Sequence, residues 1–131
     1  MKLRLRGSSI RLRLTRSEVE RLQRGERVEE SLAVGGARLI YAVETVEGDD
    51  PPAARLALPH GRAELTVLLS HRQVEGWAAG DEVGIYSEEA GGPDERLTLA
   101  VEKDFRCLTP RSEAEDAPDA YPHPQEGEAA C

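Results

Sequence analysis

Aromatic residues are scarce in this chain, and long apolar runs are absent. Phe, Trp and Tyr make up 4% of its 131 residues, and Trp77 is the one tryptophan. The core must therefore consist mostly of Leu, Val, Ile and Ala, with Trp77 as its one large anchor. No segment approaches the roughly 18 apolar residues that a membrane-spanning helix needs. Residues 2–6 alternate Lys or Arg with Leu, unlike a signal peptide, so the sequence predicts a cytoplasmic protein that does not bind membranes.

Cysteines and the residue patterns of known catalytic centres are also rare. Cys107 and Cys131 do not form a disulfide framework. The chain has no nucleophile elbow, phosphate loop, dinucleotide fingerprint or zinc-protease helix, so we predict no catalytic residue, no metal and no cofactor. The exception is Cys107, where Lys103 and Arg106 could favour a reactive thiolate, although a buried structural cysteine is the commoner outcome. A metal site built from Cys107, His123 and Cys131 would match no recognised ligand spacing.

The net charge of −8 hides a strong asymmetry along the chain. Residues 1–24 contain eight basic and two acidic residues, whereas residues 108–131 contain six acidic residues and one basic residue. The overall negative charge argues against nucleic-acid binding, because a polyanion repels an acidic body. Residues 109–131 are rich in Pro, Ala and acids, which predicts a disordered tail after a single domain spanning residues 1–108.

Two parts of the sequence resemble each other, which indicates an internal duplication. Residues 15–28 match residues 70–83 at an offset of 55. In both segments a hydroxyl residue precedes Glu or Gln by three positions, as in a helix capping box, and a glycine ends the helix. Residues 38–44 and 96–102 share five of seven residues at an offset of 58. We therefore predict repeats over residues 2–46 and 54–103, joined by a linker at 47–53.

Alternating apolar residues and turn signals predict the same ββαββ order in each repeat. The expected fold is mainly β (α+β): an antiparallel eight-stranded barrel or a barrel-like sandwich with two short helices. The three extra residues of the second repeat are expected in the turn at 90–94. The predicted strands are 2–6, 9–14, 27–33, 38–46, 54–58, 63–69, 82–88 and 95–103, and the predicted helices are 16–24 and 71–79.

The first two strands carry the strongest candidate for a binding site. Gly7 and Ser8 form a two-residue turn, which places Arg4 opposite Arg11 and gathers five basic residues on one face: Lys2, Arg4, Arg6, Arg11 and Arg13. Like charges that face each other across strands are destabilising. We therefore predict a small anionic ligand or an acidic protein partner on this face.

The chain also contains acidic residues that could neutralise this basic face from within the protein. Carboxylates of neighbouring strands, such as Glu29, Glu44 or Glu102, could balance a solvated surface, or the acidic C-terminal tail could dock there. In the second repeat, Thr66 and Leu68 stand where the first has Arg11 and Arg13. The fold therefore does not require the basic face, which favours a binding role in a non-enzymatic binding or accessory protein.

Two stretches of the chain resemble a family of small bacterial proteins of unknown function. They are KLRLRGSSIRLRLTRSEV at residues 2–19, and KDFRCLTPR at residues 103–111 followed by YPHP at 121–124. The resemblance implies no activity, but it implies that the C-terminal stretch has a role. A weaker, architectural likeness is to the triphosphate tunnel enzymes, whose barrels of duplicated units are lined by Arg, Lys and Glu. It implies an alternative function, phosphohydrolysis, which requires the basic face to line the interior. The N-terminal strand of alternating glutamates found in that group is missing here.

Overall fold

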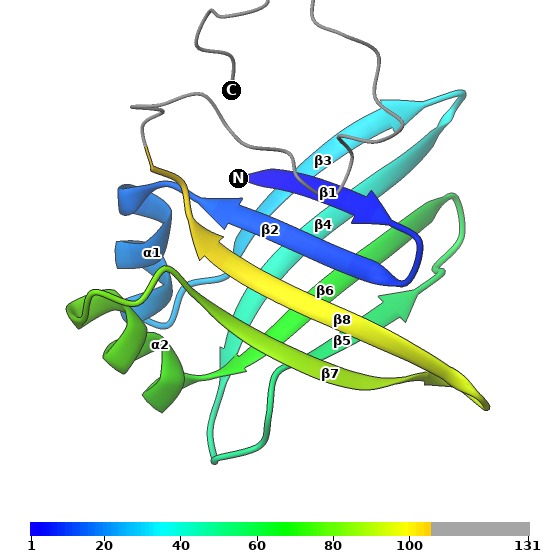
Figure 1. Cartoon of the computed structure of the whole chain (residues 1–131). Helices are drawn as coiled ribbons and strands as arrows, with labels where there is room; N and C mark the ends of the chain where they lie inside the picture. Colours follow the sequence, from blue (N-terminus) through cyan, green and yellow to red (C-terminus); the bar gives the residue numbers. More distant parts are fainter. Residues whose placement is uncertain (106–131) are drawn as a thin grey trace, which may run out of the picture.

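The ββαββ order predicted for each half of the chain is present in a computed structural model, which describes residues 1–105 (Figure 1). Helix α1 ends one residue earlier than predicted, and most strand ends agree within one residue, whereas β7 begins two residues later and ends four residues later. The elements are β1 Lys2–Arg6, β2 Ser9–Leu14, α1 Arg16–Gln23, β3 Val28–Val34, β4 Ala37–Val46, β5 Ala53–Ala57, β6 Arg62–Ser70, α2 His71–Ala79, β7 Gly84–Gly92 and β8 Glu95–Lys103.

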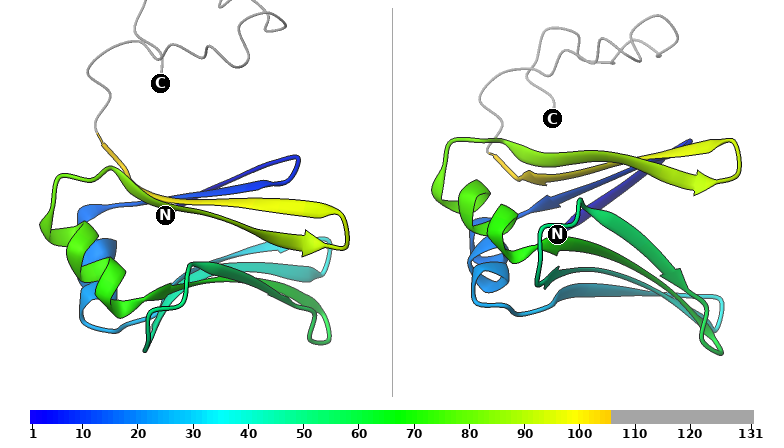
Figure 2. Two further views of the ribbon diagram at one scale, coloured as in Figure 1. Left: turned by 60° about the horizontal axis from the view of Figure 1, so that its bottom comes forward. Right: turned by 90° about the horizontal axis from the view of Figure 1, so that it is seen from below.

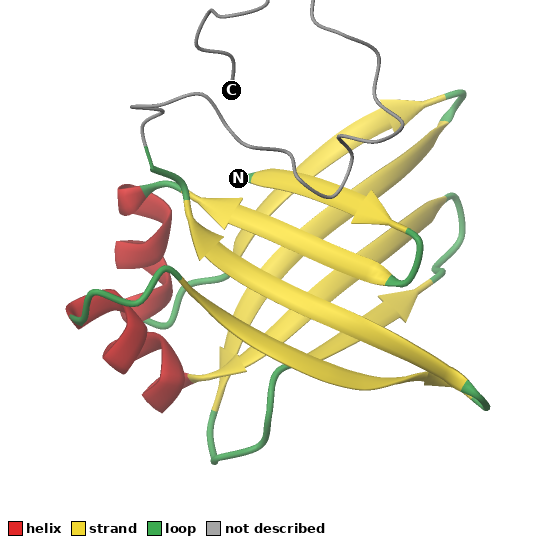
Figure 3. Ribbon diagram, viewed as in Figure 1, coloured by secondary structure: helices red, strands yellow, loops and turns green. Residues whose placement is uncertain are grey.

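The strands form two four-stranded sheets that face each other as two layers (Figure 2). Sheet A has the strand order β1-β2-β8-β7, and sheet B has the order β3-β4-β6-β5. Both helices lie at one end of the two layers, where they pack against each other (Figure 3). The predicted mainly β fold with two helices is therefore confirmed, and its sandwich-like form is the one adopted.

The closed antiparallel barrel is not what forms, because the central strands of each sheet run parallel. Strand β2 pairs with β8, and β4 pairs with β6, both in parallel. Each helix carries the chain from one sheet to the other, so a hairpin from the first half meets a hairpin from the second half in each sheet. The parallel neighbours are joined through other strands, β4 to β6 by way of β5 and β2 to β8 by way of all the elements between them, because parallel pairing cannot be made by a short hairpin turn. The sheets remain separate and do not close into a barrel within residues 1–105.

The turn at Gly7 and Ser8 sets the predicted register of the first hairpin. Lys2 lies opposite Arg13, Arg4 opposite Arg11 and Arg6 opposite Ser9. Gly7 has a φ of +52°, a left-handed conformation that glycine adopts readily. Because side chains alternate between the faces of a strand, this register also decides which residues of β2 enter the core.

The core lies between the sheets and beneath the helices, and Trp77 is its largest fully buried side chain. The indole Nε1–H of Trp77 donates a hydrogen bond to the Val83 carbonyl at 3.2 Å, which satisfies its polar group. Val19 and Leu22 of α1 and Val74 of α2 are buried in the same cluster. The predicted apolar faces of both helices therefore pack against the sheets. No helix within the described residues is long and apolar enough to cross a membrane.

The two helix caps are alike in sequence but differ in their hydrogen bonds. At α1, Thr15 accepts from the Glu18 backbone N–H, and the Glu18 carboxylate accepts from the Thr15 backbone N–H at 2.9 Å. At α2, Ser70 accepts from the Gln73 backbone N–H at 3.1 Å. The Gln73 Oε1 atom, however, is buried without a hydrogen-bond partner. The predicted capping box is thus complete in α1 and half-formed in α2.

Candidate functional site

The five basic residues of the first hairpin lie on the outer face of sheet A. Ile10, Leu12 and Leu14 of β2 are buried in the core, so the residues that alternate with them point away from it. We call Lys2, Arg4, Arg6, Arg11 and Arg13 the basic ladder. The phosphohydrolase hypothesis requires these side chains to line an enclosed interior, and the fold places them on the opposite side of the sheet.

Arg11 and Arg13 share one carboxylate, that of Glu102. Their Nε atoms lie 3.4 and 3.6 Å from Glu102 Oε1. The parallel register places Glu102 beside Arg13, which is how a residue so distant in sequence reaches the basic ladder. Glu102 is 12% exposed, compared with 39% for Arg11 and 23% for Arg13. One well-covered negative charge therefore serves two guanidinium groups.

Tyr86 and Gly84 of the neighbouring strand β7 position Glu102. The Tyr86 hydroxyl donates to Glu102 Oε2 at 2.7 Å, and burial together with this hydrogen bond raises the pKa of Tyr86. Gly84 lies opposite Glu102, and a Cβ there would come within 2.9 Å of Glu102 Cγ and 3.0 Å of the Tyr86 hydroxyl. Sequence reasoning missed both residues, although a glycine inside a strand is a known signal of close approach.

The start of the basic ladder lies where the chain leaves sheet A. Lys2 Nζ is 3.2 Å from Asp104 Oδ2, and the Asp104 backbone N–H donates to the Leu14 carbonyl at 2.8 Å. A shallow pocket of about 140 Å³ lies over the hairpin, and its lining residues are Lys2, Leu3, Arg4, Arg11 and Arg13. The structure therefore brings four members of the ladder together around one concave surface, with Arg6 beyond them beside the turn.

The outer face of sheet B carries carboxylates together with arginines, among them Arg27 and Arg55. Arg27 contacts the carboxylates of Glu29, Glu44 and Glu64, which come from three different strands. Burial alone would lower the pKa of Arg27, but hydrogen bonds to Glu44 and Glu29 outweigh it, and the pKa is raised. Two of the carboxylates expected to neutralise the basic ladder, Glu29 and Glu44, are therefore committed to the other sheet. Of the three, only Glu102 contacts the ladder.

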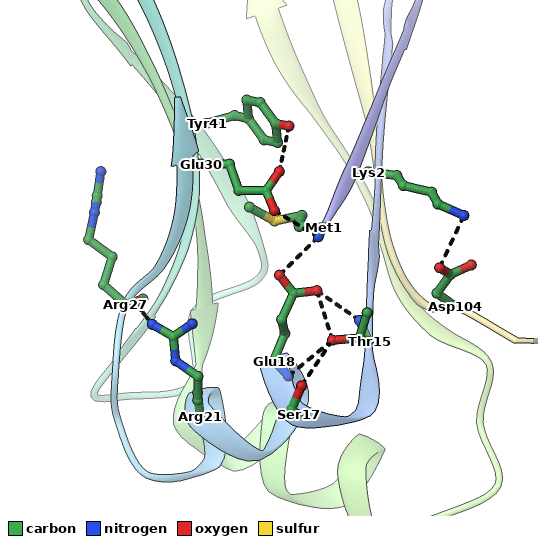
Figure 4. A network of polar contacts seen from close by, with 10 residues as sticks. All are labelled: Met1, Lys2, Thr15, Ser17, Glu18, Arg21, Arg27, Glu30, Tyr41 and Asp104. Carbon is green, nitrogen blue, oxygen red and sulfur yellow. Dashed lines mark hydrogen bonds and ion pairs between the residues drawn. The ribbon is translucent and has the colours of Figure 1, made fainter. Parts of the chain in front are cut away.

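A second polar cluster joins the two sheets along the edge formed by β1 and β3 (Figure 4). The Met1 amine, which is fully covered, lies 2.9 Å from Glu18 and 3.1 Å from Glu30. The Tyr41 hydroxyl donates to Glu30 at 2.8 Å, which raises the pKa of Tyr41. All of these groups are satisfied by one another, so the cluster has a structural role.

Residues 1–125 match the model of a family described as a family of unknown function, DUF7009. The chain belongs to the DUF7009 family. This confirms the resemblance to an uncharacterised family that the two ends of the sequence indicated. No curated protein matches the chain, and no solved structure matches it.

Several residues singled out from the sequence lie outside the described part of the chain. These are Cys107, His123, Cys131 and the acidic residues of 109–131. The thiol and metal hypotheses at Cys107 therefore stay predictions. Within residues 1–105, no group of three His, Cys, Asp or Glu side chains is placed to hold a metal ion.

Proposed function

We propose that this DUF7009 protein is a non-enzymatic binding protein whose basic ladder holds an extended acidic segment of a partner protein. The observation that carries the proposal is the sharing of Glu102 by Arg11 and Arg13 on an outer sheet face. A guanidinium that shares a carboxylate retains donors for a second one, because arginine has five N–H groups. Arg–carboxylate contacts are among the stronger and more directional hydrogen bonds in proteins.

The shape of the site favours an extended polypeptide over a small molecule. Alternate residues of a strand are about 7 Å apart, so Lys2, Arg4 and Arg6 form a row along β1. A pocket of about 140 Å³ is smaller than the roughly 300–1,000 Å³ typical of small-molecule sites. Regularly spaced carboxylates on an extended chain could contact successive members along the whole row, including Arg6, which lies beyond the pocket.

The test compares binding of a fluorescent poly-glutamate peptide to two double variants. The first, Arg4→Ala with Arg11→Ala, removes one facing pair of the ladder, because these residues lie directly opposite each other. The control, Arg38→Ala with Arg55→Ala, removes the same charge from sheet B. We expect fluorescence anisotropy at low salt to show a loss of about tenfold or more for the first variant and little change for the control.

Three outcomes of this experiment would contradict the proposal. Equal loss in both variants would indicate an effect of net charge alone. Unfolding of the Arg4/Arg11 variant, detected by circular dichroism, would indicate a structural role. Stabilisation by inorganic tripolyphosphate, without any binding of the peptide, would replace the acidic partner with a small anion. A folded Arg4/Arg11 variant that has lost peptide binding supports the proposal.

We also infer that the two halves of the domain arose by duplication. Supporting this, the parallel pair Ser9 and Thr98 in sheet A corresponds, at the two sequence offsets, to the pair Glu64 and Ile40 in sheet B. The strand pairing also locates the three extra residues of the second half. Two of them precede β7, and the third is Gly91, at the irregularity between Ala90 and Gly92. On this correspondence one of the three extra residues lies in the 90–94 turn where all three were expected.

The correspondence between the two halves explains why Arg55 is part of the control variant. Arg55 faces Thr66 in the second hairpin, as Arg4 faces Arg11 in the first. The second hairpin therefore keeps one basic residue at the positions where the first has five. A role confined to the first hairpin explains why one half carries the ladder and the other does not.

A further inference from the structure

We propose that residues 108–131 of the same chain occupy the basic ladder and compete there with the acidic partner. This inference rests on the proposed function, because it makes the acidic C-terminal segment an internal substitute for the partner. The segment carries six acidic residues and one basic residue; the acidic residues are Glu113, Glu115, Asp116, Asp119, Glu126 and Glu128. The segment thus offers the carboxylates that the basic ladder is proposed to bind.

The chain leaves the described domain beside the ladder. Asp104 contacts Lys2 at 3.2 Å, and its backbone is tied to Leu14 at the end of β2. The described part of the chain therefore ends next to the first member of the ladder. An intramolecular site of this kind has a high effective concentration, because short connections keep the segment close to its target.

The length of the segment is sufficient for it to follow the whole hairpin. A chain extends by at most about 3.3–3.6 Å per residue, so the eight residues from Phe105 to Glu113 can span about 27 Å. The distance along β1 from Lys2 to Arg6 is about 13 Å, at 3.3–3.4 Å per residue. Glu113 and the acids after it can therefore reach every position of the ladder.

The charge pattern of the two outer faces favours the ladder over the other sheet. On sheet B, Glu29, Glu44 and Glu64 contact Arg27, and Arg55 lies beside Glu44 and Glu64 in the same pocket. Three carboxylates offset the two arginines there, whereas within residues 1–105 Glu102 and Asp104 are the carboxylates in contact with Arg11, Arg13 and Lys2 on sheet A. An acidic segment is therefore attracted more weakly to sheet B than to the ladder. The electrostatic preference points to sheet A as the one docking face.

Paramagnetic relaxation enhancement of the full chain tests this docking directly. A spin label is attached at Cys131 in a Cys107→Ser background, and amide signals are compared between the oxidised and reduced label. We expect strong broadening of residues 2–13 and little effect on β3 and β5. Salt near 1 M, where the Debye length is about 3 Å, should remove the broadening. Replacing the six acids by Gln or Asn should remove it as well.

A second measurement tests the competition. If the segment occupies the ladder about 90% of the time, neutralising its six acids should increase the affinity for poly-glutamate about tenfold, because only the unoccupied fraction can bind. An unchanged affinity would overturn the competition. Absence of broadening, uniform broadening, or broadening centred on sheet B would overturn the docking.

Two further outcomes distinguish docking within one molecule from docking between copies, and docking from the binding of an acidic partner. In a mixture of ¹⁵N-labelled molecules without a spin label and spin-labelled molecules without ¹⁵N, broadening of the amide signals would indicate docking between copies and overturn the intramolecular arrangement. Salt-sensitive broadening of residues 2–13, with no peptide binding by any variant, would support docking while the proposed partner fails. The two proposals can therefore fail independently.

Discussion

Glu18 links the Met1 amine to the first turn of α1, and its replacement by glutamine tests how much this link stabilises the domain. Its carboxylate is 2.9 Å from the covered amine and also accepts from the Thr15 backbone N–H at 2.9 Å. Glutamine has nearly the same shape but no charge. A hydrogen bond to a charged group contributes about 1.5–3 kcal/mol, while Glu30 remains beside the amine. We therefore expect Glu18→Gln to lower the free energy of unfolding by about 2 kcal/mol, within the range for one hydrogen bond to a charged group.

The pH dependence of this loss follows from two opposite pKa shifts. Burial alone would raise the pKa of Glu18, but hydrogen bonds from the Thr15 backbone and the Met1 amine outweigh it, and the pKa is lowered. Burial alone would lower the pKa of the Met1 amine, but Glu18 and Glu30 outweigh it, and the pKa is raised. The stabilisation is present above the ordinary pKa of glutamate and is lost as pH falls through the folded value. It is also present below the ordinary amine pKa and is lost as pH rises through the folded value.

Urea unfolding of protein that begins at Met1, with no tag, measures this difference across pH. The difference in the free energy of unfolding between wild type and Glu18→Gln should be largest near neutral pH and should decrease toward acidic and toward alkaline pH. At helix α2 the corresponding residue is Gln73, whose buried Oε1 has no hydrogen-bond partner. Gln73→Met should therefore be neutral or slightly stabilising. A Glu18→Gln loss below about 0.5 kcal/mol, well under the range for such bonds, or a gap independent of pH would refute the reasoning.

Three further substitutions test packing and helix stability. Gly84→Ala should destabilise the domain by about 2 kcal/mol or more, because the added Cβ would lie 2.7 Å from the Val101 carbonyl oxygen. Gly76→Ala in α2, where an added Cβ would meet no atom within 4 Å outside the nearby backbone of the helix, should instead stabilise it by about 0.5–1 kcal/mol, and thermal unfolding distinguishes the two. Trp77→Ala should cost about 3–5 kcal/mol, because this 1% exposed side chain is the largest in the core; a loss below about 1 kcal/mol in urea unfolding would contradict that role.

Local features of the sequence determined the elements and the first hairpin. The turn at Gly7 and Ser8, with strict alternation on both sides, permits only one pairing of β1 with β2 that buries Leu12 and Leu14, because a slip of one residue would expose them. The cap at Thr15 and the periodic apolar residues located α1 in the same way. Membership of an uncharacterised family could also be inferred from the two ends of the chain. These features depend on residues close together in the sequence.

The tertiary structure alone decided how the hairpins combine and what contacts the basic ladder. The parallel pairing of β2 with β8 follows from the helices carrying the chain between sheets, and no local pattern records which distant strand will be the neighbour. That pairing brings Glu102 to Arg11 and Arg13, and β7 then brings Tyr86 to Glu102. Alternation showed that the arginines share a face, but whether that face lines an interior or meets solvent depended on where the second sheet packs. Burial of Ile10, Leu12 and Leu14 between the sheets placed the ladder outside.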